Sequence, residues 1–140
     1  MKAKESAFNE CLYFSSSALS RKVEKMAEES WKKVDLSPSH AYLLTLTITE
    51  PGIQAGEIAE QLHLTPSTIT RLIQKLEEKK LVVRISEGKS TLVYPTEKSR
   101  SLYPKMQECL NEFYEKYTSV LGREESARFI RNINKLNDKL

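Results

Sequence analysis

Residues 56–84 read GEIAEQLHLTPSTITRLIQKLEEKKLVVR, and this stretch decides the fold. Apolar residues recur at helical spacing, which predicts short helices over 55–61 and from 65 to about 80. Thr65-Pro66 marks the start of the second helix, because a threonine N-cap followed by proline is a typical helix opening. The spacing of the pair is that of a helix-turn-helix. Its apolar positions hold Ile58, Leu62, Leu64, Ile69 and Leu72.

Two further positions of this pair have special requirements. The point where the helices touch needs a small side chain, and Ala59 occupies it. The turn needs a residue that tolerates positive φ, and His63 stands where glycine is more usual. Histidine visits this conformation more readily than most residues, so the turn remains compatible with a helix-turn-helix.

The second helix is predicted to present a polar face made of Pro66, Ser67, Thr68, Thr70, Arg71, Gln74 and Lys75. Hydroxyl groups reach base edges or phosphates in a DNA major groove, and arginine can bind guanine through two hydrogen bonds. The free N–H groups at the helix N-terminus also attract a phosphate. No acidic residue lies between Glu60 and Glu77, so this face does not repel DNA. The alternative is an ordinary solvated helix face.

A β-hairpin is predicted after this helix. The β-rich strings 81–86 and 90–95 flank Glu87-Gly88-Lys89, and a hairpin there would form a wing. Residues 79–105 hold seven basic and two acidic side chains, a net charge of +5, whereas the whole chain carries only +3. Arg84 and Lys89 are therefore candidate contacts to the DNA backbone.

Longer helical patterns flank this region. Residues 5–33 contain no glycine or proline and predict a helix of roughly 28 residues, about 42 Å long. Residues 38–49 alternate like a strand, but Ser37-Pro38 and the length favour a buried helix. A helix from 96 to about 117 has Pro104 near its start or at a kink. A last helix over 123–140 is predicted to turn Phe129, Ile130, Ile133 and Leu136 inward.

Residues 56–84 resemble the core of the MarR family of winged helix-turn-helix regulators, and other strings fit in order. These are LSPSHAYLLTLTITEPG (36–52), VYPTEKSRSLYP (93–104) and the Gly122-Arg-Glu-Glu opening of the last helix. The resemblance implies a mainly α fold with a small β-hairpin wing. It also implies helical dimerisation regions at 1–36 and 97–140 and a DNA-binding lobe at 37–96, together one structural domain. Family wings commonly carry an Asp-x-Arg element, whereas the tip here reads SEGKST, with Lys89 as its only basic residue.

The resemblance further implies a homodimer that binds palindromic double-stranded DNA, with repression as the commoner mode and release by a small molecule or by thiol oxidation. Tyr13, Trp31 and Tyr42 could line an effector pocket, or they could be core or interface residues. Cys11 is the candidate redox residue, although alignment on Arg21 places the sensor cysteine of the family near Tyr13. Two alternatives stay open: a winged-helix protein that acts through protein partners or non-specific DNA binding, and a thiol-based repressor that uses Cys11.

Composition excludes several other classes. With 39% hydrophobic and 29% charged residues, 4 Gly and 5 Pro, the 140 residues fit one compact domain rather than a disordered or collagen-like chain. Two distant cysteines and the string MKAKESAFNECLYF, which lacks a signal peptide's apolar stretch, favour the cytoplasm, and DNA binding would place the protein at the nucleoid. Two histidines are too few for a metal site, and no membrane span is expected. No enzymatic motif occurs, so neither a cofactor nor catalysis is expected.

Overall fold

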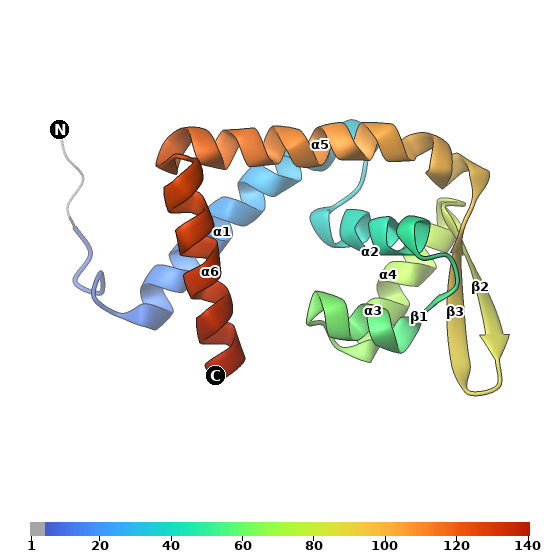
Figure 1. Ribbon diagram of the computed structural model, residues 1–140. Helices are drawn as coiled ribbons and strands as arrows, with labels where there is room; N and C mark the ends of the chain where they lie inside the picture. The colour runs from blue at the N-terminus through green and yellow to red at the C-terminus, as the bar shows by residue number, and fades with distance from the viewer. Residues whose placement is uncertain (1–4) are drawn as a thin grey trace.

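The computed structural model describes residues 5–140, which form helices around a small sheet (Figure 1). The first four residues of the predicted 1–36 region, and of its N-terminal string, lie outside this description. The helices are α1 (Leu12–Trp31), a short 3-10 helix η1 (Lys32–Val34), α2 (Pro38–Thr49), α3 (Ala55–Leu62), α4 (Pro66–Glu78), α5 (Glu97–Leu121) and α6 (Arg123–Lys139). The strands are β1 (Ile53–Gln54), β2 (Val82–Glu87) and β3 (Ser90–Pro95).

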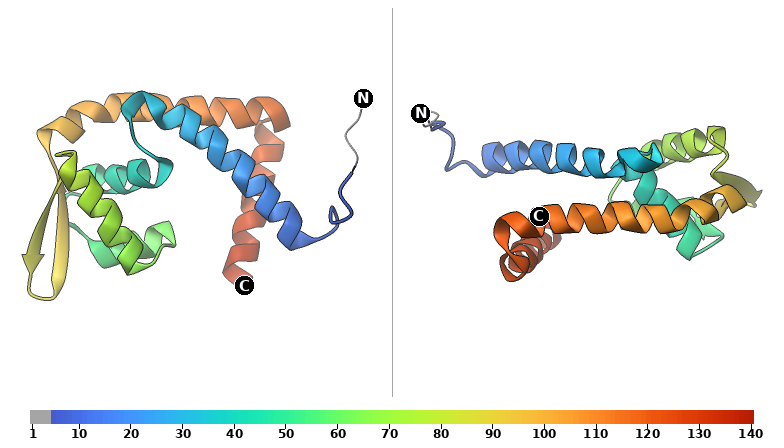
Figure 2. Two further views of the ribbon diagram at one scale, coloured as in Figure 1. Left: turned by 180° about the vertical axis from the view of Figure 1, so that it is seen from behind. Right: turned by 90° about the horizontal axis from the view of Figure 1, so that it is seen from above.

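The long helix α5 runs along the molecule and connects its two ends (Figure 1). At one end lie α2, α3, α4 and the sheet, and at the other end α6 turns away from α5. Seen from above, α1 runs alongside α5 (Figure 2). The mainly α fold with a hairpin wing, predicted from the sequence, is confirmed.

Side-chain caps fix three helix starts where the sequence predicts them. Ser37 accepts a hydrogen bond from the backbone N–H of His40, and Thr65 accepts one from Thr68. At the start of α5, Thr96 and Ser99 form a reciprocal capping box. Each such cap satisfies backbone N–H groups that the helix itself cannot, which is typically worth about 1 kcal/mol.

The sheet has the strand order β1–β3–β2, with antiparallel pairing throughout. The predicted hairpin is confirmed: Glu87 pairs with Ser90, so Gly88 and Lys89 form the tip, and Gly88 has a φ of 63°. The short strand β1 was not predicted. It forms because Gly52, at a φ of 87°, donates its N–H to the carbonyl of Val93 at 2.8 Å.

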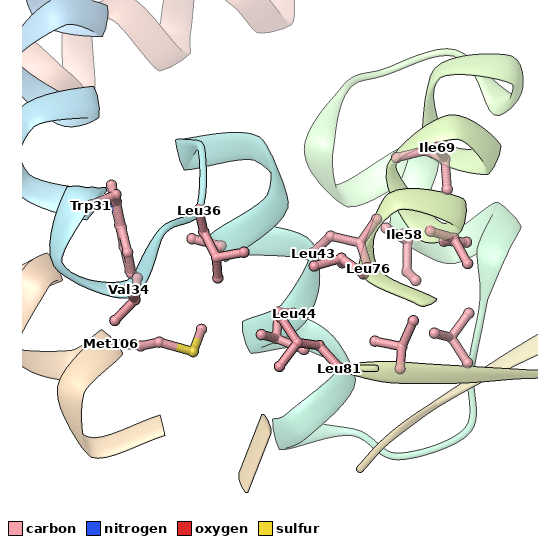
Figure 3. Packing of buried hydrophobic residues seen from close by; sticks show 14 of the residues in the cluster. Trp31, Val34, Leu36, Leu43, Leu44, Ile58, Ile69, Leu76, Leu81 and Met106 are labelled. Carbon is pink, nitrogen blue, oxygen red and sulfur yellow. The ribbon is translucent and has the colours of Figure 1, made fainter. Parts of the chain in front are cut away.

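One hydrophobic core joins the lobe to the long helices (Figure 3). Trp31, Val34 and Met106 fill the end beside α5, and the helix-turn-helix side chains fill the other end. The ambiguous segment 38–49 is a helix, as favoured, and its Leu43 and Leu44 are fully buried. Burial of one leucine contributes about 1.5–3 kcal/mol, so these two side chains of α2 stabilise the core substantially.

The first helix is shorter than predicted. It begins at Leu12 because Cys11 has an extended backbone, with φ −92° and ψ 123°. Before it, the N–H of Cys11 donates to the carbonyl of Phe8 at 2.9 Å and closes a turn. The prediction of a helix over 5–33 is therefore wrong at its start; the helix has 20 residues and is about 30 Å long.

The surroundings of the apolar face of α6 also differ from the prediction, which turned this face inward. Phe129, Ile130, Ile133 and Leu136 do not point inward in this chain, because each is 40–43% exposed. Phe129, Ile133 and Leu136 line a groove of about 990 Å³ together with Leu12, Leu19 and Val23 of α1. Helical periodicity identified an apolar face correctly, but within residues 5–140 this face stays partly exposed.

Across residues 5–140, no helix has both the length and the apolar character that a membrane crossing requires.

Candidate DNA interface

Helix α4 presents one face to the core and the opposite face to solvent. Ile69, Ile73 and Leu76 are almost completely buried. The residues predicted to form the outward face lie where expected: Pro66, Ser67, Thr70, Arg71, Gln74 and Lys75 are exposed, and Thr68 is half-buried. The turn before α4 is also as predicted, because His63 adopts the left-handed conformation with φ 54° and ψ 42°.

The hydroxyl groups of the first turn of α4 bond to one another. Thr65 Oγ1 accepts from the backbone N–H of Thr68 and lies 2.9 Å from Thr68 Oγ1 and 3.2 Å from Ser67 Oγ. These contacts hold the N-terminal turn in one arrangement before any ligand approaches. The proline at the first helical position fixes φ there without losing a hydrogen bond.

Two side chains of the outward face are positioned by their neighbours. Thr70 donates its hydroxyl to the carbonyl of Pro66 at 3.0 Å. Arg71 donates from Nη2 to Thr68 Oγ1 at 3.4 Å, which uses one of its five N–H donors and leaves the rest for a ligand. Lys75 lies 3.9 Å from Glu78, a long and exposed pairing that restrains it little.

An ion pair that sequence reasoning missed joins strand β2 of the wing to helix α4. Arg84 Nη2 lies 2.7 Å from Glu77 Oε1, and both side chains are about one-third exposed. The positive charge of Arg84 is therefore partly neutralised within the protein. Opposite charges seven residues apart gave no helical i,i+4 signal, so only the fold brings them together.

Among the other basic residues of the 79–105 segment, some bond within the protein and others stay exposed. Lys79 Nζ donates to the backbone carbonyl of Asp35 at 2.7 Å and lies 3.2 Å from its carboxylate. Lys98 donates to the carbonyl of Lys79 at 2.9 Å. Lys89 lies exposed at the hairpin tip. The net charge of +5 that the sequence places in this segment therefore overstates the charge available to a ligand.

His40 lies in the first turn of α2. Its ring Nδ1 bonds with Ser37 Oγ at the start of α2. Burial lowers the pKa of His40 below its ordinary value, and the positive charges of Lys79 and Lys75 lower it further. The neutral imidazole is thus the form that the folded protein favours.

The three aromatic residues predicted to line a pocket do not lie together. Tyr42 lines a hollow of about 460 Å³ with Phe113, Tyr114 and Tyr117 of α5. Trp31 is 1% exposed and packs edge-on against Tyr42, with ring centroids 6.1 Å apart, so it is a core residue behind the hollow. Tyr13 is 80% exposed and stands 18 residues before Trp31, about 27 Å away along α1. Tyr13 and Tyr42 therefore cannot line one pocket within the same chain.

The α5 aromatic residues were missed by sequence reasoning. Phe113 and Tyr117 lie one turn apart on α5, and the structure pairs their rings at 5.2 Å beside the hollow. Burial raises the pKa of Tyr42 and of Tyr117, and each is raised further by a neighbouring tyrosine. Both phenols stay protonated and can donate a hydrogen bond at neutral pH.

The two cysteines occupy different environments. Cys11 is exposed and forms the N-cap position of α1, and the hydrogen bonds and ion pairs within residues 5–140 include none to its thiol. Cys109 is fully buried, which raises the pKa of its thiol. In the described part of the chain, no three His, Cys, Asp or Glu side chains gather as metal ligands would.

Comparison with known proteins identifies relatives of this arrangement. A family model described as "MarR family" matches residues 34–90. The HTH-type transcriptional repressor MdtR of Bacillus subtilis (strain 168) is 29% identical over 76 residues, 54% of this chain and 49% of that protein. The chain thus matches about half the length of this relative.

Solved structures match over almost the whole chain. The transcriptional repressor CouR bound to a 23-mer DNA duplex has a TM-score of 0.86 at 20% identity, covering 98% of this chain and 99% of its own. In its complex with p-coumaroyl-CoA, CouR gives 0.88 at 19% identity, covering 99% and 100%. The S. aureus MepR–DNA complex gives 0.79 at 20% identity, covering 92% and 98%. The helix-turn-helix region is thus similar to the MarR family, and the whole chain shares its fold with these solved structures.

Proposed function

We propose that this chain is a sequence-specific DNA-binding transcriptional regulator, a repressor, that acts by binding rather than by catalysis. The observation that carries the proposal is the outward face of α4, where Arg71 and a set of hydroxyl groups stand without any acidic neighbour between Glu60 and Glu77. MdtR is named a repressor, and the CouR and MepR structures contain DNA, which supports the same function here.

Each part of the interface has a role in this proposal. The exposed residues of α4 enter the major groove, where Arg71 reads a base edge and the first turn contacts a phosphate. The hairpin lies along the backbone, and Lys89 at its tip contacts a phosphate as a point charge. Arg84 holds the wing against α4 through Glu77 rather than binding DNA directly.

The regulator acts as a homodimer. The apolar groove between α1 and α6 is open in the single chain, and seven of its lining residues are large apolar side chains: Leu12, Leu19, Val23, Phe129, Ile133, Leu136 and Leu140. A second copy supplies matching helices to cover it.

Regions 1–36 and 97–140 then dimerise, and region 37–96 binds DNA in the cytoplasm, at the nucleoid. The two recognition helices enter successive major grooves about 34–36 Å apart on a palindrome.

A small-molecule effector would act at the hollow beside Tyr42. The hollow lies between α2 of the lobe and α5 of the dimerising region, so a ligand there can bias their relative position. Its aromatic rings and two protonated phenols fit a flat aromatic molecule with a hydrogen-bond acceptor. The CouR structure with p-coumaroyl-CoA supports an effector of this general kind.

The experiment that tests the function is selection of fragments from the native genome by the purified chain, followed by anisotropy titrations. Binding of one palindrome well above unrelated duplexes supports the proposal. Salt-sensitive binding without sequence preference would instead support a winged-helix protein that has lost specific readout. A Cys11→Ser chain that still responds fully to peroxide would exclude redox control through Cys11.

A further inference from the structure

The polar face of α4 offers fewer free hydroxyl groups than its sequence suggests. Ser67, Thr65 and Thr68 bond among themselves, and Thr68 also accepts from Arg71. Thr70 is exposed, stands at the centre of the face and follows the buried Ile69. The group that Thr70 presents to a ligand therefore depends on whether its hydroxyl is already hydrogen-bonded within the protein.

The hydroxyl of Thr70 is committed to the helix backbone. Oγ1 donates to the carbonyl of Pro66, one turn earlier, at 3.0 Å. This bond draws the hydroxyl back along the helix and leaves the Cγ2 methyl group as the free end of the side chain. Thr70 thus places a small apolar group beside Arg71 on an otherwise polar face.

Base pairs in the major groove differ in whether they carry an apolar group. Thymine alone presents a C5-methyl group there, and the threonine methyl is a suitable contact for it. Building on the proposed function, we propose that Thr70 is a specificity-determining residue that selects thymine through methyl–methyl contact. Arg71 follows Thr70 in the chain and is also exposed, so the base that Arg71 binds lies in the same half-site as this thymine.

Two variants separate the methyl group from the hydroxyl group. Thr70→Ser keeps a hydroxyl and loses the methyl group, whereas Thr70→Val keeps a methyl group and loses the hydroxyl. Thr49→Ser is the matched control, because Thr49 is also exposed and donates its hydroxyl one turn back, to Thr45. Both positions are at the surface, so circular dichroism should show unchanged helix content in all three variants.

In the first experiment, each protein selects duplexes from a random-sequence library. The unchanged chain, the Thr70→Val variant and the Thr49→Ser variant should enrich the same thymine in each half-site. The Thr70→Ser variant should accept other bases at that position and keep its preference elsewhere.

In the second experiment, deoxyuridine replaces that thymine in the duplex the unchanged chain selects, which removes only the C5-methyl group. Burial of one methyl group is worth about fourfold in affinity, so substitution should cost about fourfold in one half-site and about sixteenfold in both. The Thr70→Ser variant should bind both duplexes equally.

The outcomes distinguish this inference from the function on which it rests. If the unchanged chain enriches no sequence, the proposed function fails, and the role of Thr70 fails with it. If the chain enriches a palindrome but Thr70→Ser keeps the same thymine, or if deoxyuridine changes affinity by less than about 1.5-fold, the role of Thr70 alone is overturned.

Discussion

Replacement of Lys89 by alanine should weaken the salt dependence of operator binding, whereas replacement of Arg84 should not. Both residues are basic and belong to the wing, and the sequence alone treats them alike. The structure separates them: Arg84 lies 2.7 Å from Glu77, while Lys89 stands exposed at the tip. A cation that is already paired releases fewer counterions from DNA than a free one.

The size of the effect follows from the number of phosphate contacts removed. Each contact contributes about 0.9 to the slope of log affinity against log salt concentration, and a homodimer presents two wing tips. The Lys89→Ala variant should therefore lose about 1.8 from this slope. Between about 50 and 200 mM salt, the affinity of the unchanged chain should fall about 12-fold more than that of the variant. Arg84→Ala should leave the slope nearly unchanged and cost up to about 1 kcal/mol of stability.

The assay is fluorescence anisotropy with the selected palindromic duplex across a salt series. Lys135→Ala, on the exposed side of α6, serves as a control that removes the same charge far from the wing. The reasoning is refuted if Arg84→Ala lowers the slope as much as Lys89→Ala does, since the ion pair would then not restrain Arg84. A loss confined to one operator sequence with Lys89→Ala would contradict the phosphate assignment.

Three further predictions test the recognition helix, the dimer and the electrostatics of the lobe. Arg71→Ala should cost about 1–3 kcal/mol of operator binding and relax preference at one base pair, and unchanged affinity and preference would remove Arg71 from the site. Ile133→Glu should convert dimers to monomers in sedimentation velocity and abolish tight operator binding, and a dimeric variant would contradict the role of the groove. Because its pKa is lowered in the folded state, His40 takes up a proton more readily after unfolding. The free energy of unfolding should therefore fall as the pH drops through 6.5, the ordinary histidine pKa. In His40→Gln this decline should be smaller, and equal declines in both proteins would exclude His40 as its source.

Local signals in the sequence predicted the elements that position the site. The caps at Ser37 and Thr65 were predicted because each depends on contacts within one turn, whereas the equally local capping box at Thr96 was not predicted. The left-handed turn at His63 follows from the same short-range reasoning. The start of α1 was not predictable in this way, because no glycine or proline marks the extended backbone at Cys11.

Features that depend on distant contacts escaped the sequence analysis. Strand β1 exists because two residues pair with β3 about forty positions later. The Arg84–Glu77 pair likewise depends on how the wing folds back on α4. The periodic patterns of α1 and α6 resembled those of core helices, because periodicity identifies an apolar face without specifying what covers it.

Ion pairs within the protein leave fewer basic side chains for phosphate contacts, which changes the relative contributions of phosphate contacts and base contacts to DNA binding. Asp35 and Glu77 hold Lys79 and Arg84, so part of the wing segment's positive charge is satisfied before DNA arrives. Phosphate contacts supply affinity without sequence information, whereas base contacts supply specificity. With Arg84 paired and no arginine at the tip, strands β2 and β3 and their turn leave Lys89 as the basic side chain that contacts phosphate. The face of α4 must then supply a larger share of operator binding, so substitutions at Thr70 and Arg71 should reduce discrimination between sequences more than substitutions in the wing.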